Sequence, residues 1–140
     1  MKIKYKVISL YCFTQIDKNL ISDLRDKILE FEKYDISGLI IIGEEGINGT
    51  FCGSEEFVNM LFTFIKEFCE INDLNEKISF SDKKIFKRLK VKIKSEIVTI
   101  GMKNVNPASI KGTYLDAKEW NEFIKDEDTI LIDTRNYYEV

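Results

Sequence analysis

ISGLIIIGEEGINGTFCG, residues 36–53, contains two short strands and the turn between them. Leu39 to Ile42 is an apolar run that is long enough for a buried strand and too short for a helix. Thr50 to Cys52 resumes a strand after Asn48-Gly49, a dipeptide that favours hairpin turns because both residues tolerate positive φ. The stretch therefore predicts a β-hairpin with an acidic tip that contains glycine.

The glycines of this tip have two interpretations. In the first, they serve only the backbone geometry of a hairpin, and the spacing alone favours this interpretation. In the second, Gly43, Gly46 and Gly49 keep Cβ atoms away so that another backbone or a ligand can approach closely.

The residues before the hairpin predict a strand and a helix. Tyr5 to Phe13 has apolar residues on both faces, which is typical of a central strand. Asp17 or Asn19 can cap the helix that follows. The apolar side chains of this helix recur at helical spacing and predict its buried face: Leu20, Leu24, Ile28 and Phe31.

The residues after the hairpin predict a second helix and a fourth strand. Ser54 is placed to cap the helix, with Glu55 and Glu56 in its first turn. Ile78 to Phe80 alternates as a short strand does. One apolar stripe predicts the face of the helix that packs in the core, rather than a platform for stacking bases: Phe57, Leu61, Phe64 and Phe68.

The order strand–helix–strand–strand–helix–strand indicates an α+β fold of the ferredoxin-like (acylphosphatase-like) βαββαβ type, with two helices on one face of an antiparallel sheet. We expect it over residues 1 to about 82, inside a domain of residues 1–103. This topology places residues 39–42 at a sheet edge, although their composition suits a central strand. We therefore expect another segment to cover that edge, and a later strand is the candidate.

That later segment, residues 83–94, contains seven basic residues and no acid. Leu89, Val91 and Ile93 alternate with lysines, as in a strand with one apolar and one basic face. The lysines have two interpretations. They discourage pairing at a sheet edge, or they bind successive phosphates of a nucleic acid, because neighbours on one strand face lie ~7 Å apart and phosphates along a strand are similarly spaced. The basic residues just upstream favour the second interpretation. The candidate phosphate-binding residues are Lys83, Lys84, Arg88, Lys90, Lys92 and Lys94.

Composition excludes several classes of site. The chain has no histidine, which excludes a Ser-His triad, a histidine base and a metal site built on histidine. Cys12, Cys52 and Cys69 form no CxxC motif, and we expect small core residues in a reduced cytosolic protein. We expect no signal peptide and no membrane span, because no apolar run of ~18 residues is present, and therefore a cytoplasmic chain without a membrane partner.

The last part of the chain has a different character. Residues 104–111 hold the only proline and are predicted to form a linker. Beyond it, Asp116 can cap a short helix, and residues 129–132 are predicted to form a buried strand. A helix and a strand cannot close a core of their own. We therefore expect residues 112–140 to pack on the first domain, to self-associate with another copy of the chain, or to be loosely ordered.

Five motifs, in order along the chain, resemble the rhodanese-domain tRNA uridine hydroxylase family: GEEGINGT (43–50), RLKVKIKSEIVTIG (88–101), GTYL (112–115), EWN (119–121) and DTRNYYEV (133–140). Members of that family carry out oxygen-dependent 5-hydroxylation of the wobble uridine of certain tRNAs. In them a rhodanese-like domain carries a cysteine loop well beyond the DTR motif. The sequence stops before that loop, so we expect these 140 residues to be truncated and inactive alone.

The resemblance implies roles for particular residues. It implies tRNA as the partner of the basic segment, and it makes residues 112–140 the start of a rhodanese-like α/β domain. Asp133, Arg135 and Glu139 then have structural roles, with the arginine paired to a carboxylate a few residues on. Molecular oxygen is the implied co-substrate, and no cofactor is evident in the sequence. The hairpin tip is expected near the substrate entrance: Glu45, Gly46, Asn48, Gly49 and Thr50.

The alternative is a non-catalytic RNA- or protein-binding module of the same fold. Acylphosphatase activity is not expected, because residues 14–19 lack the glycines and the arginine of that enzyme's anion loop. A conventional RNA-recognition motif is not expected either. Its inner strands present several aromatic side chains, whereas the second strand of the hairpin offers only Phe51.

Overall fold

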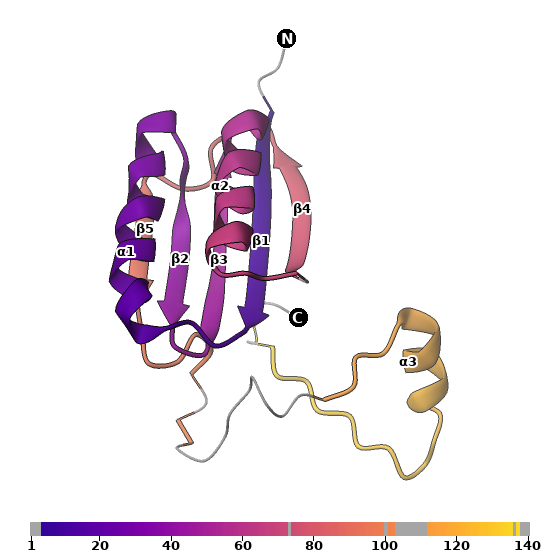
Figure 1. Cartoon of the computed structure of the whole chain (residues 1–140). Helices are drawn as coiled ribbons and strands as arrows, with labels where there is room; N and C mark the ends of the chain where they lie inside the picture. The colour runs from indigo at the N-terminus through magenta and orange to yellow at the C-terminus, as the bar shows by residue number, and fades with distance from the viewer. Residues whose placement is uncertain (1–3, 73, 100, 103–111, 136, 138–140) are drawn as a thin grey trace. The chain divides into compact units, whose positions relative to one another are not determined.

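The computed structural model describes residues 4–72, 74–99, 101–102, 112–135 and 137. It divides the chain into two units, residues 1–110 and 111–140, which are considered separately. The elements of the first unit (Figure 1) are, in order, β1 (Tyr5–Phe13), α1 (Lys18–Leu29), the 3₁₀ helix η1 (Glu30–Tyr34), β2 (Ser37–Gly43), β3 (Gly46–Gly53), α2 (Glu55–Phe68), β4 (Asn75–Ser81) and β5 (Leu89–Ile93).

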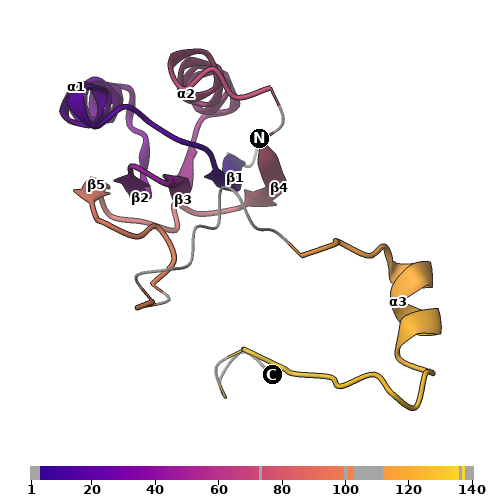
Figure 2. The same cartoon turned by 60° about the horizontal axis from the view of Figure 1, so that its bottom comes forward.

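The five strands form one sheet in the order β4-β1-β3-β2-β5. The pairs β4–β1, β1–β3 and β3–β2 are antiparallel, and α1 and α2 lie together on one face (Figure 2). This arrangement confirms the ferredoxin-like prediction. β5 pairs in parallel with β2, opposite Leu39 and Ile41, so the basic strand covers the apolar edge as expected.

Short-range signals set the ends of the helices. The side chain of Asp17 accepts a hydrogen bond from the amide of Asn19, so Asp17 is the cap of α1. Asp35, with φ of 59°, ends η1 in the left-handed conformation. Ser54 occupies the N-cap position of α2, but its side chain makes no capping hydrogen bond.

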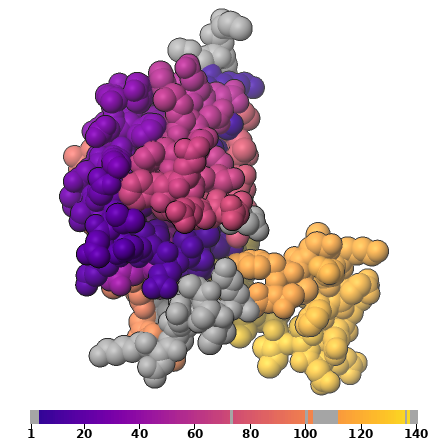
Figure 3. Space-filling model, in the orientation of Figure 1, coloured from indigo at the N-terminus to yellow at the C-terminus, as the bar shows by residue number. Residues whose placement is uncertain are grey.

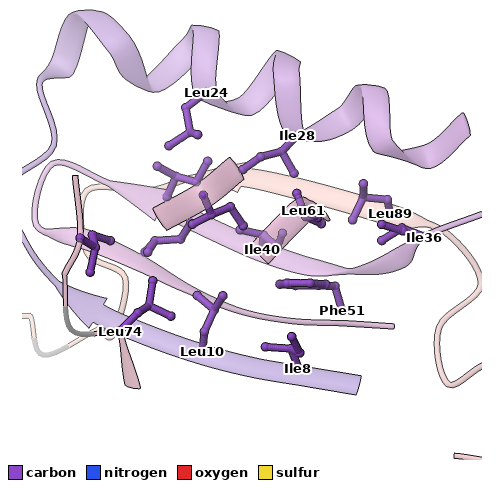
Figure 4. Close-up of a cluster of buried hydrophobic side chains, with 14 of the residues drawn as sticks. Ile8, Leu10, Leu24, Ile28, Ile36, Ile40, Phe51, Leu61, Leu74 and Leu89 are labelled. Carbon is purple, nitrogen blue, oxygen red and sulfur yellow. The ribbon is translucent and has the colours of Figure 1, made fainter. Parts of the chain in front are cut away.

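The core lies between the sheet and the two helices (Figure 4). Phe51 and Ile8 come from the central strands, and Leu24 and Ile28 point towards them from α1. Figure 3 shows the helical face that closes this core from outside. One residue of the predicted α1 stripe is wrong: Leu20 is 45% exposed, whereas Ile21, one position on, is buried.

The predicted α2 stripe is only partly correct. Val58, Leu61 and Ile65 are buried, and of the four predicted residues only Leu61 is among them. The three phenylalanines are half-buried beside the core, and two of them, Phe57 and Phe64, pack with aromatic rings after α1. Tyr34 stacks on Phe57 at 4.6 Å between ring centroids, and Phe31 lies 5.7 Å from Phe64. They are therefore packing residues, as expected, at the border of the core rather than at its centre.

The hairpin turn is not where the sequence signal placed it. Gly43 pairs with Gly46, so Glu44 and Glu45 alone make the turn. Asn48-Gly49 lies inside β3, because Asn48 pairs with a residue of β2 on one side and of β1 on the other.

The connection from β4 to β5 crosses the sheet from one edge to the other. Residues 82–88 run over the face that carries no helix (Figure 2). Three side chains on this face are buried although they lie outside the main core: Val7, Ser37 and Cys52. The face opposite the helices, which we call the open face, is therefore covered at one end and accessible elsewhere.

In the second unit, α3 (Ala117–Phe123) begins at Asp116 with a capping box, as predicted. The strand predicted at residues 129–132 is wrong, because these residues form no strand and Ile130 is 84% exposed. Arg135 pairs with Asp133 at 2.6 Å, and its hydrogen bonds lower the pKa of that carboxyl. Glu139 and the expected linker lie outside the described residues. No helix among the described residues is long and apolar enough to cross a membrane.

Candidate nucleic-acid interface

β5 has one apolar and one basic face, as its alternation predicts. Leu89 is buried and Val91 packs against the core, on the side of the helices. Lys90 and Lys92 alternate with them and are exposed. They pair with Leu39 and Ile41, which face away from the helices. The structure therefore places these two lysines on the open face.

Strand register extends these positions into two rows across the open face. One row is Lys90–Leu39–Thr50–Ser9–Lys77, and the other is Lys92–Ile41–Asn48–Tyr11–Asn75. Neither row contains an acid, and no strand position on this face is Asp or Glu. The β5 edge thus carries two lysines and the β4 edge one, Lys77, on either side of a neutral middle of apolar and hydroxyl or amide side chains.

Most cations of residues 83–94 have no acidic partner. Lys84 is the exception, because its ammonium pairs with Asp35 after η1. Among the described residues, no carboxylate lies within ion-pair distance of the other six, all exposed: Lys83, Lys87, Arg88, Lys90, Lys92 and Lys94. Unpaired cations beside strand positions that carry no acid produce a positive potential that attracts polyanions.

Lys94 lies apart from the two lysines of the strand. It follows the end of β5, where its amide donates to the carbonyl of Ile42. It lines a hollow of about 290 Å³ together with Lys18, Ser22 and Glu44. The predicted stripe therefore divides: Lys90 and Lys92 share the open face, and Lys94 lies beside the start of α1.

The hairpin tip is tied to the segments on both sides of it. A carboxylate oxygen of Glu45 accepts from the amide of Ile97 at 2.6 Å, and its carbonyl accepts from the amide of Thr14 at 3.0 Å. The Asn48 amide group donates to the carbonyl of Ile97 at 3.3 Å. The two bonds to Ile97 tie residues 94–99 to the hairpin tip.

A small hollow lies in the middle of the open face. It has a volume of about 220 Å³, and its lining comes from β2, β3 and the crossing segment: Leu39, Ile41, Asn48, Gly49, Thr50 and Phe86. The Thr50 hydroxyl shares a hydrogen bond with Ser9 at 2.8 Å. Sequence reasoning missed Phe86, although an aromatic residue within a basic run was a signal that could have marked it.

A family model described as "UPF0176 acylphosphatase like domain" matches residues 5–97, which include the sheet, its helices and the segment up to Ile97. The chain belongs to this family. The match agrees with the fold class and with the resemblance seen in the motifs. The photo-activated state of BlsA covers 92% of this chain and 100% of its own, with a TM-score of 0.51 and 17% identity, which bears on the fold alone.

Two curated relatives of this UPF0176 chain are named tRNA uridine(34) hydroxylase. That of Prochlorococcus marinus (strain MIT 9515) is 51% identical over 140 residues, 99% of this chain and 45% of its own. That of Bartonella quintana (strain Toulouse) is 42% identical over 140 residues, with coverage of 99% and 45%. The chain thus spans a little under half the length of these relatives.

Two of the three cysteines of this UPF0176 domain, Cys52 and Cys69, are poor nucleophiles. Cys52 is buried and contacts the Ser37 hydroxyl at 3.4 Å. Burial, and secondarily the nearby Cys12, raises the pKa of the Cys69 thiol from 9.0 to about 11. Among the described residues, no group of three or more His, Cys, Asp or Glu side chains is arranged to hold a metal.

We expect Cys69 to resist alkylation at pH 8. A thiol with a pKa raised from 9.0 to about 11 holds on the order of 100-fold less thiolate, the reactive form. Iodoacetamide labelling followed by mass spectrometry, in native buffer and in urea, measures the rate at this position. Equal rates in the two conditions would contradict the burial of the thiol.

The same shift predicts a stability change at high pH. Because the folded pKa is raised, the contribution of Cys69 is fully present below pH 9.0 and is lost as the pH rises through about 11. Urea denaturation at several pH values across this range should show that Cys69→Ala loses less of its free energy of unfolding than the native chain does.

Proposed function

We propose that this chain is the tRNA-holding, N-terminal part of a tRNA uridine hydroxylase, which performs oxygen-dependent 5-hydroxylation of the wobble uridine. The names of two relatives and the motif resemblance support the reaction class. The observation that carries the binding role is that the strand positions of the open face carry no acid and that exposed, unpaired lysines lie at its edge. None of the described residues is assigned a catalytic role, and oxygen is the co-substrate of the whole protein.

In this proposal the cations position tRNA by its phosphates. Lysine and arginine contacts to phosphates supply affinity and orientation but carry no sequence information. Lys90 and Lys92 act on the open face, while Lys83 and Arg88 extend the surface along the crossing segment. Lys94 continues it towards α1. Lys84 contributes less than the others, because a phosphate must compete with Asp35 for it.

In the same proposal, the hairpin tip forms the border of the substrate entrance. Glu45 and Asn48 hold residues 94–99 and thereby fix the end of the basic segment. Their contribution is to rigidity, and rigid elements position a flexible substrate better than loops do. Residues 112–140 are proposed as the start of a rhodanese-like domain, with Asp133 and Arg135 in structural roles.

Replacing Lys90 and Lys92 together by glutamine should weaken binding of tRNA and flatten its salt dependence. Two lost phosphate contacts should reduce the slope of log K against log salt by about 1.4 to 1.8. The fold should be unaffected, because exposed strand lysines contribute little to stability. Titration of labelled tRNA at several salt concentrations, with circular dichroism as the fold check, measures both effects.

Lys27→Gln with Lys33→Gln is the matched control. It removes the same charge from α1 and η1, which lie on the opposite face of the sheet. An equal loss of slope in both double variants would show attraction by net charge alone. An unchanged slope in Lys90→Gln with Lys92→Gln would assign these lysines to edge protection and favour a binding module without a tRNA role.

A further inference from the structure

We infer that the hollow on the open face binds one unstacked nucleobase of a single-stranded RNA segment. The inference rests on the proposed function, since it names what the same surface takes besides phosphates. It starts from a feature that phosphate binding does not explain: the basic surface borders an apolar hollow. A surface that only followed phosphates would need no such cavity.

The size and lining of the hollow suit a planar ring. Its volume of about 220 Å³ is roughly seven times the share of one liquid water, about 30 Å³. Leu39 and Ile41 supply an apolar floor from β2, and Phe86 supplies an aromatic wall from the crossing segment. Every base has a π-face that stacks on aromatic side chains, and such stacking tolerates any sequence.

Polar groups at one side of the hollow can meet the edge of a base. Asn48 donates its amide N–H to Ile97, which leaves its carbonyl oxygen as an acceptor. The Thr50 hydroxyl shares one hydrogen bond with Ser9 and retains further bonding capacity. A base carries donors and acceptors side by side on its Watson–Crick edge, so an acceptor beside a hydroxyl is complementary to it.

The charges around the hollow favour a ligand that carries a negative charge beside its apolar ring over a ligand that is only apolar. Lys90 is the strand neighbour of Leu39, and Lys92 is the strand neighbour of Ile41, so both floor residues have a lysine next to them. No acidic side chain occupies the strand positions of this face. A nucleotide unites a planar apolar ring with a phosphate, and this surface offers a site for each.

Phe86→Ala tests the inference, with Ile85→Ala as its control. Ile85 precedes Phe86, is 45% exposed and does not line the hollow. The probes are a fluorescein-labelled single-stranded octauridylate and an abasic ribose-phosphate oligomer of equal length. Phe86→Ala should bind octauridylate about 5- to 150-fold more weakly, the range found for loss of one stacked base. It should bind the abasic oligomer as the native chain does, with an unchanged salt slope.

A second variant keeps the test valid if Phe86→Ala loses its fold. The chain has one tryptophan, Trp120. Phe86→Trp in a Trp120→Phe background therefore reports from the hollow alone. Its fluorescence should be quenched by octauridylate and unchanged by the abasic oligomer. Equal response to both probes would overturn the inference, as would native-like affinity of a folded Phe86→Ala.

The lysine variant separates failure of the inference from failure of the proposed function. If Lys90→Gln with Lys92→Gln lowers the salt slope for both probes while Phe86→Ala binds normally, phosphate binding stands and the base site is wrong. If the native chain binds neither probe even at low salt, both the proposed function and the base site are wrong.

Discussion

Replacing Phe51 by alanine should lower the free energy of unfolding by about 3–5 kcal/mol, the cost of removing a buried aromatic side chain and leaving a cavity. Phe51 is 0% exposed and lies in β3 beneath the helices, with Ile8 opposite it in β1 (Figure 4). The total free energy of unfolding of a domain of this size is about 5–15 kcal/mol. Urea denaturation followed by circular dichroism should therefore show a much lower midpoint.

Phe80→Ala is the matched control for this prediction. Phe80 lies in the edge strand β4 and is 55% exposed, so removing its ring leaves no closed cavity. Its effect should stay within about 1 kcal/mol, as for most partly exposed substitutions. Equal losses at both positions would contradict a core centred on β3.

The strands of the first unit were predictable because each carries its own short pattern, whereas the apolar run at residues 129–132 wrongly predicted another. Tyr5–Phe13 is a strand with the bounds that its composition indicated. In β5, apolar residues and lysines alternate between the two faces of the sheet, as the sequence predicted. The sheet face of each helix was harder to predict. In α2, Phe57–Leu61–Phe64 and Val58–Leu61–Ile65 are both apolar stripes that share one residue. Periodicity alone does not say which of two neighbouring stripes meets the sheet and which meets the other helix.

Pairing overrode a local propensity in the hairpin. Asn-Gly is a strong turn signal, yet Asn48 and Gly49 each pair with residues on both flanking strands. A two-residue turn at Glu44-Glu45 brings Ile42 opposite Ile47 and buries both. A turn at Asn48-Gly49 would lose this register, so the apolar pairs decide the position.

The basic part of the candidate site was predictable, but its aromatic part was not. Consecutive lysines are visible in the sequence, whereas the place of Phe86 depends on strand order. Only because β4 and β5 are the two edges of the sheet does their connection cross the open face. For the same reason the partner of Lys84, Asp35, could not be assigned from local sequence.

Gly46→Ala should be among the most destabilising single substitutions in the hairpin. It should lower the free energy of unfolding by on the order of 2–6 kcal/mol. Gly46 has φ of 145°, a conformation that costs other residues about 1–3 kcal/mol. A Cβ there would also lie 2.0 Å from the carbonyl oxygen of Cys12 in β1. Because that oxygen belongs to a backbone, the strands must move apart, at a further cost of about 1–3 kcal/mol.

Two other glycines separate these contributions. Gly101 has φ of 73°, and no described residue lies within 4 Å of a Cβ there, so Gly101→Ala should show backbone strain alone, about 1–2 kcal/mol. Gly112 has no positive φ and no neighbour within 4 Å among the residues that the structure describes, so Gly112→Ala should change stability little. Urea denaturation of the three variants should rank them in this order. If Gly46→Ala costs no more than Gly101→Ala, the close approach of β1 to the hairpin is wrong. The turn would then owe its position to its two glutamates rather than to the neighbouring strand.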